Sequence, residues 1–180
     1  VFNTLMLIGF VRQIELFVCR VLPQKEDDSE GRLKYITGGL LSTSEHSIWQ
    51  ARNEIGVLAE RCMKMLGMVR QCLDTEKDAD FEKIYKKVEH YEQITDNMEE
   101  EIASYLRKVS EGRLSAYSKN HIACMLREVD ELESIGDSFY HLARTVSRKR
   151  KNEPAPFTIK QQANIEQMLD LVNEAMEDMH

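Results

Sequence analysis

Apolar residues recur at the spacing of one long α-helix between residues 43 and 74. They lie three or four positions apart and form a seam that holds for four heptads, which is the pattern of a helix packed along its length against others. The seam consists of Ile48, Ala51, Ile55, Leu58, Cys62, Met65, Val69 and Cys72. A Ser42-x-x-Glu45 capping box precedes the seam. We therefore expect a helix over residues 43–74, about 48 Å long at about 1.5 Å per residue.

Three further helices are predicted by similar signals. A polar turn precedes a helix expected over residues 79–110, with Gly112 just past its end as a C-terminal cap. A helix over residues 114–151 follows, and a Thr158-x-x-Gln161 capping box opens the last one. Long helices joined by short loops pack antiparallel. The predicted fold class is all-α, an antiparallel three-helix bundle with an additional C-terminal helix and an N-terminal juxtamembrane helix.

The first 22 residues are the most apolar part of the chain. The first eleven carry no charge, whereas Arg12, Glu15 and Arg20 follow, and a bilayer crossing needs about 20 apolar residues. Two interpretations stay open: an amphipathic or partly buried helix, or the cytoplasmic end of a transmembrane helix with both arginines on the cytoplasmic side. We divide the chain into a juxtamembrane segment (1–23), a linker (24–42) and a helical bundle (43–180).

Composition narrows the possible functions. The chain has 24 basic and 31 acidic residues, and this net charge of −7 argues against nucleic-acid binding. Its four cysteines show no C-x-x-C spacing, so we expect neither a zinc knuckle nor disulfides, and a reducing, cytosolic setting. We find no nucleophile elbow, no glycine-rich phosphate loop and no pair of helices that both carry the Glu-x-x-His motif of di-iron oxidases. We therefore do not expect an enzyme.

One acidic pattern occurs twice, 41 residues apart. Residues 88–96 and 129–137 both read Val-acid-x-apolar-Glu-x-Ile-x-Asp, and both lie in acidic stretches without lysine or arginine. A solvated helix usually intersperses basic residues for i,i+4 pairs. On a helical wheel, Glu92 falls inside the apolar face and Asp96 borders it, and the second copy repeats this geometry. Charges on such a face are costly unless they are paired or bound to a metal.

The four acids of the two copies are candidate metal ligands. If Gly112 marks the turn, Glu92 and Glu133 lie at nearly the same height on antiparallel helices, with Asp96 and Asp137 displaced to opposite sides. Four carboxylates form an oxygen-rich site for a hard cation. Weaker candidates for the same site are Glu89, Asp130 and His141.

Simpler explanations stay open for the charged features. Arg52 or Arg61 could neutralise the acids, or the acids could be solvated. Gly136 would permit close approach of backbone or ion. The basic run Arg144–Lys151 either contacts an acidic membrane surface or a partner, or it only complements the helix dipole.

The paired Glu-x-x-x-Asp motifs resemble those of the PhoU family. In that family a three-helix unit carries E(D)-x-x-x-D motifs, and its third helix reads L-E-R-I-G-D, where this chain has L-E-S-I-G-D at residues 132–137. Phe2-Asn3 with the apolar run, and the segments 34–36, 39–43 and 51–55, are similar to the junction that bacterial sodium/phosphate cotransporters place before a cytoplasmic PhoU-like domain. Because a complete PhoU has two three-helix repeats, and this chain ends in mid-pattern, we expect the bundle to be incomplete.

The resemblance implies a regulatory, metal-binding domain of a sodium-dependent phosphate cotransporter, on the cytoplasmic side of the inner membrane. Its implied partner is the transporter membrane domain of the same chain, and a homo-oligomer is compatible with it. The implied cofactor is a divalent or trivalent ion (iron, zinc, magnesium or manganese), and phosphate would bind only through that metal. Alternatives are a free-standing PhoU-type regulator of an ABC phosphate transporter, a carboxylate-bridged metal enzyme, and a scaffold without a site.

Overall fold

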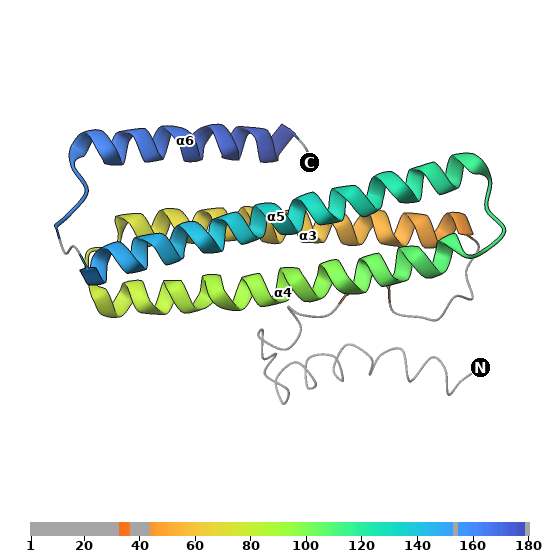
Figure 1. Cartoon of the computed structure of the whole chain (residues 1–180), viewed down its shortest axis with the longest axis horizontal. Helices are drawn as coiled ribbons and strands as arrows, with labels where there is room; N and C mark the ends of the chain where they lie inside the picture. The colour runs from red at the N-terminus through yellow and green to blue at the C-terminus, as the bar shows by residue number, and fades with distance from the viewer. Residues whose placement is uncertain (1–32, 37–43, 153–154, 179–180) are drawn as a thin grey trace, which may run out of the picture. The chain divides into compact units, whose positions relative to one another are not determined.

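The computed structural model describes residues 33–36, 44–152 and 155–178, and all regular structure in these ranges is α-helical. The helices are α3 (Ser44–Asp74), α4 (Asp78–Ser110), α5 (Ala116–Asn152) and α6 (Ile159–Asp178) (Figure 1). The predicted all-α class is therefore confirmed, and the predicted bounds of the three long helices are right to within two residues. The expected juxtamembrane helix, most of the linker and the Ser42 cap lie outside the described residues.

Helices α3, α4 and α5 form the bundle, and each of them packs against the other two (Figure 1). The predicted seam of α3 is buried along its length, except for Ile48, which is only partly buried. Facing it are Val88, Met98 and Ile102 of α4 and Met125 and Val129 of α5, all at most 1% exposed. Burial of this continuous apolar seam is the main force that holds the three helices together.

Helix α6 is an appendage that packs mainly on α3. Only Leu169 and Met176 of α6 are buried. The predicted capping box forms: the Thr158 amide donates to Gln161 Oε1 (2.9 Å), and the Gln161 amide donates to Thr158 Oγ1 (3.3 Å). The box satisfies two amides at the start of α6 and so fixes where the helix begins.

The turn between α4 and α5 is longer than the sequence suggested. The Gly112 amide donates to Val109 O (3.2 Å), and no described glycine has a positive φ. Gly112 thus lies just past the end of α4, as predicted, and it does not adopt the left-handed conformation. Helix α5 begins at Ala116. Ser115 caps its N-terminus, because the Ser115 hydroxyl oxygen accepts a hydrogen bond from the Ser118 amide (3.1 Å). This late start of α5 sets the height at which its side chains meet those of α4.

Arg150, in the basic run at the end of α5, stabilises the turn between α3 and α4. The Arg150 guanidinium donates to the carbonyls of Thr75 and Glu76, pairs with Asp78 (3.0 Å), and lies 4.6 Å from the centroid of the Phe81 ring. One side chain of α5 thus ties the α3–α4 turn in place. Dipole complementation is therefore only part of what this run does.

Among the described residues, no helix combines the length and the apolar character that a bilayer crossing requires.

Candidate metal centre

Three of the four predicted acids converge between α4 and α5. Carboxylate oxygens of Glu92, Asp96 and Asp137 all lie within 4.8 Å of one another, and we call these three residues the acidic triad. Glu92 and Asp96 are four residues apart on α4 and therefore project from one face of that helix. Asp137 reaches the same place from α5. Glu92 and Asp137 are half-buried, and Asp96 is exposed.

The register of α4 and α5 explains which acids meet. A Cβ atom on Gly136 would lie 3.4 Å from Thr95 Oγ1, so these two residues are opposite each other. Asp137 therefore falls between Glu92 and Asp96 in height. The prediction that Glu92 faces Glu133, with the two aspartates displaced to opposite sides, is wrong because the α4–α5 turn is centred beyond Gly112.

Glu133 lies beside the acidic triad rather than within it. Burial raises the pKa of its half-buried carboxyl, and repulsion by Asp137, Asp96 and Glu99 adds to this effect. The Ser134 hydroxyl donates to Glu133 Oε2 at 3.5 Å, a long hydrogen bond that acts in the opposite direction. Glu133 thus extends the acidic region from the triad toward Glu99.

Two acids of the triad are less readily ionised in the folded protein than in water. Burial raises the pKa of Glu92, and the nearby Asp96, Asp137 and Glu89 raise it further. Burial and the charge of Asp137 likewise raise the pKa of Asp96. Glu92 and Asp96 therefore hold their protons more tightly than in water, because they are partly shielded from solvent and their neighbours have the same charge. A bound cation would reverse this penalty.

Three ion pairs of the described part of the chain lie away from these acids. They join Arg70 to Asp170, Lys83 to Asp80 and Arg150 to Asp78. Arg52 is exposed on α3, and the buried Arg61 acts electrostatically on Glu54.

The weaker candidates fall into two groups. Glu89 and His141 lie near the triad, since both affect the pKa of Glu92, Glu89 by raising it and His141 by lowering it. His141 Nδ1 lies 2.8 Å from the Asp137 carbonyl oxygen, which can only accept, so Nδ1 is the donor of this hydrogen bond. Metal-binding histidines are often oriented by a hydrogen bond of this kind from the ring nitrogen that does not bind the metal. Asp130, in contrast, is exposed and does not belong to the triad.

The wall behind the triad contains residues that the sequence did not single out. The buried Thr95 donates its hydroxyl to the carbonyl of Glu92 (2.9 Å), one turn earlier. The Cys62 thiol donates to Leu132 O (3.3 Å), and burial raises its pKa to about 12. Cys62 is therefore a packed thiol and not a thiolate ligand. A small residue before each aspartate, Thr95 and Gly136, was the available signal for this close packing.

Beyond Glu89 the surroundings of the triad become aromatic and basic. The rings of Tyr85 and Tyr140 stack with centroids 6.3 Å apart. Burial raises the pKa of Tyr85 to about 12, Tyr140 and Glu89 raise it further, and the charge of Arg144 lowers it. The acidic triad is thus bordered on this side by two phenol groups and a guanidinium.

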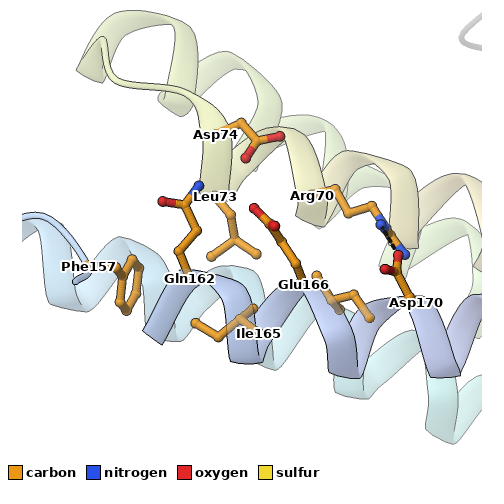
Figure 2. Close-up of a pocket in the computed structure, with 9 residues that line it drawn as sticks. Arg70, Leu73, Asp74, Phe157, Gln162, Ile165, Glu166 and Asp170 are labelled. Atoms are coloured by element: carbon orange, nitrogen blue, oxygen red, sulfur yellow. Dashed lines mark ion pairs between the residues drawn. The ribbon is translucent and has the colours of Figure 1, made fainter. Parts of the chain in front are cut away.

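A separate pocket lies at the junction of α3 and α6 (Figure 2). Its volume is about 180 Å³, and the Arg70–Asp170 ion pair (2.7 Å) closes one side of it (Figure 2). Its walls come from the end of α3, from Phe157 and from α6, so it shares no residue with the acidic triad. It reflects loose packing of α6 on the bundle.

Comparison of the chain with protein-family models, with curated proteins and with solved structures found no match. The PhoU resemblance therefore rests on the sequence motifs quoted above.

Proposed function

We propose that this chain is a PhoU-like, metal-binding regulatory domain on the cytoplasmic side of a sodium-dependent phosphate cotransporter. The observation that supports the metal site is the convergence of Glu92, Asp96 and Asp137, whose carboxylate oxygens lie within 4.8 Å of one another. Carboxylate oxygens are the ligands that hard cations prefer. Iron, zinc, magnesium and manganese are the ions that we propose.

The link to phosphate follows from charge. The negative charges of the acidic triad repel a free phosphate, so phosphate would bind only at open positions of the metal. Arg144 lies close enough to Tyr85 to lower its pKa. It therefore adds a positive charge on the side of the triad where Glu89 and Tyr85 lie. A metal-bound oxyanion would therefore meet favourable charge on one side of the site.

Metal binding gives the domain a means of regulation. Because the triad joins α4 and α5, occupancy would change the free energy of bringing these helices together. The transporter membrane domain of the same protein is the partner that would respond. The first test is the coding sequence upstream of Val1: repeated hydrophobic spans support a cotransporter, whereas a start codon close to Val1 would favour a free-standing regulator.

The second test is phosphate uptake by the full-length protein. Asp137→Asn removes a triad carboxylate, and Asp130→Asn removes an exposed acid of the same helix outside the triad. We expect the first variant to alter the dependence of uptake on added metal and the second to leave it unchanged. Identical uptake in both variants and the parent protein would contradict the regulatory role. A carboxylate-bridged metal enzyme stays less favoured, because no general base separate from the acids is evident.

A further inference from the structure

A short segment before α3 lies against the bundle although the sequence placed it in a polar linker. We call residues 33–36 the strap. Its Leu33 and Ile36 pack on the hydrophobic core, and the ring of Tyr35 contacts Trp49 edge-on, with centroids 6.2 Å apart. Trp49 is the only tryptophan of the chain. The strap therefore has a natural fluorescent reporter beside it.

Three hydrogen bonds from α3 hold the backbone of the strap. Glu54 Oε1 accepts from the amides of Lys34 and Tyr35, the latter at 3.2 Å. Gln50 Nε2 donates to Tyr35 O (2.8 Å), and the Tyr105 hydroxyl of α4 donates to Gln50 Oε1 (3.0 Å). The strap is thus fastened by side chains of one helix that a second helix braces.

The buried carboxyl group of Glu54 is energetically unfavourable when it is ionised. Glu54 is 0% exposed, and within the described ranges no group donates a hydrogen bond to its second oxygen, Oε2. A buried carboxylate oxygen without a donor is a large penalty. A neutral glutamine could accept the same two amide bonds without a buried charge. The choice of glutamate therefore points to a closed state whose stability depends on the charge of this residue.

We infer that Glu54 is the latch of a conformational strap: in the closed state its carboxyl group fastens residues 33–36 to α3, and in the open state the strap leaves and water solvates the carboxylate. This inference is independent of the acidic triad and of the proposed transport function. It concerns only the strap, α3 and the bracing tyrosine of α4.

The latch is sensitive to pH with a defined sign. Burial raises the pKa of Glu54 in the closed state, while the Tyr35 and Lys34 amides and the charges of Arg61 and Lys34 lower it by less. The titratable neighbour on α4 is Tyr105, which acts through Gln50. In the open state the pKa returns to its ordinary value. Stabilisation of the closed state is therefore complete below that ordinary value and is lost as pH rises through the raised pKa.

The test is hydrogen exchange of the Lys34 and Tyr35 amides by NMR, with Trp49 fluorescence followed over the same pH range. In the parent protein we expect protection of both amides to fall as pH rises, after correction for intrinsic exchange. Glu54→Gln keeps an acceptor oxygen and removes the charge, so protection should become independent of pH. Glu54→Ala removes the acceptor, so both amides should exchange at least about tenfold faster at every pH. Glu82→Gln, an exposed glutamate of α4, is the matched control.

Two results would overturn the latch. One is unchanged protection of the strap amides in Glu54→Ala while the core amide of Leu58 stays protected. The other is a pH response in Glu54→Gln equal to that of the parent protein. His46 stacks on Trp49 in every variant, so only the difference between variants counts in the fluorescence. If Glu54→Ala loses protection at Leu58 as well, the Glu54→Gln comparison alone decides.

Discussion

Thr95 of α4 and Gly136 of α5 lie opposite each other, and a Cβ atom on the glycine would be 3.4 Å from the threonine hydroxyl oxygen. Each residue immediately precedes an aspartate, Asp96 and Asp137. Two small residues in direct apposition let the helices approach, and the carboxylate oxygens of the adjacent aspartates then lie within 4.8 Å of each other. The same repeat that supplies the acids therefore also supplies the packing that brings them together.

Substitutions of Gly136 should separate packing from helix propensity. An alanine Cβ would meet Thr95 Oγ1, Cys62 Sγ and Met65 Sδ at 3.4–3.8 Å, which is ordinary contact. Gly136→Ala should therefore be neutral or stabilise the fold by up to about 1 kcal/mol through its helix propensity. Gly136→Leu should cost about 1–3 kcal/mol because it overpacks the interface. Thermal denaturation measures both changes, and a large loss of stability with alanine would contradict the described contact.

The metal-free protein should become less stable as pH rises through the titration of Glu92, Asp96 and Glu133. Glu92, Asp96 and Glu133 all have raised pKa values in the folded state. An acid whose pKa is raised in the folded state stabilises the fold fully below its pKa in the unfolded chain. This stabilisation is lost as pH rises through its pKa in the folded protein. Asp137→Asn removes the repulsion that all three feel and should flatten the pH profile. Melting temperatures between pH 4 and pH 8 with a chelator present are the measurement, and equal slopes in both proteins would contradict the electrostatic account.

Arg150 should contribute strongly to stability, and lysine should not replace it. Its carbonyl hydrogen bonds and its contact with Phe81 matter more than its pair with Asp78, whose side chain is 94% exposed. We expect Arg150→Ala to cost about 2 kcal/mol in unfolding free energy, since hydrogen bonds to a charged group contribute about 1.5–3 kcal/mol. Arg150→Lys should recover less than half of this loss, because an ammonium cannot bridge two carbonyls and a carboxylate in the same plane. The exposed Arg148→Ala is the control and should stay within about 0.5 kcal/mol of the parent protein in chemical denaturation.

The described cysteines should differ in their rates of alkylation. Burial raises the pKa of Cys62 to about 12 and that of Cys72 to about 11, whereas Cys124 is exposed. Iodoacetamide should therefore label Cys124 in the native protein and label Cys62 and Cys72 only after unfolding. Peptide mass spectrometry of timed samples gives the three rates. Rapid native labelling of Cys62 would show that the wall behind the triad is open to solvent.

Local patterns in the sequence predicted the helices because a buried stripe must repeat at the helical period. The α3 seam and the Thr158–Gln161 box follow from such short-range rules. The convergence of Glu92 and Asp137 could be anticipated, because acids on facing sides of adjacent antiparallel helices must meet somewhere. The position along the helices at which they meet could not be anticipated, because it depends on the number of residues in the α4–α5 turn.

Long-range contacts of single side chains were beyond prediction. Arg150 reaches carbonyls about 75 positions away, and nothing in the basic run indicates that one of its members is structural. Glu54 stands in an apolar seam as an isolated acid, and its partners are backbone amides, which no sequence pattern reveals. Such contacts depend on the assembled tertiary structure.

The central claim, that the acidic triad binds a metal, is tested most directly by calorimetric titration of chelator-treated protein with Mn²⁺ and, separately, with Zn²⁺. We expect one ion per chain for the parent protein and for Asp130→Asn, and affinity at least about tenfold weaker for Asp137→Asn. At a hundredfold excess over Kd, the bound ion should also stabilise the parent fold by about 2.7 kcal/mol. Absence of binding by the parent protein to either ion, or equal affinity in Asp137→Asn, would contradict the claim.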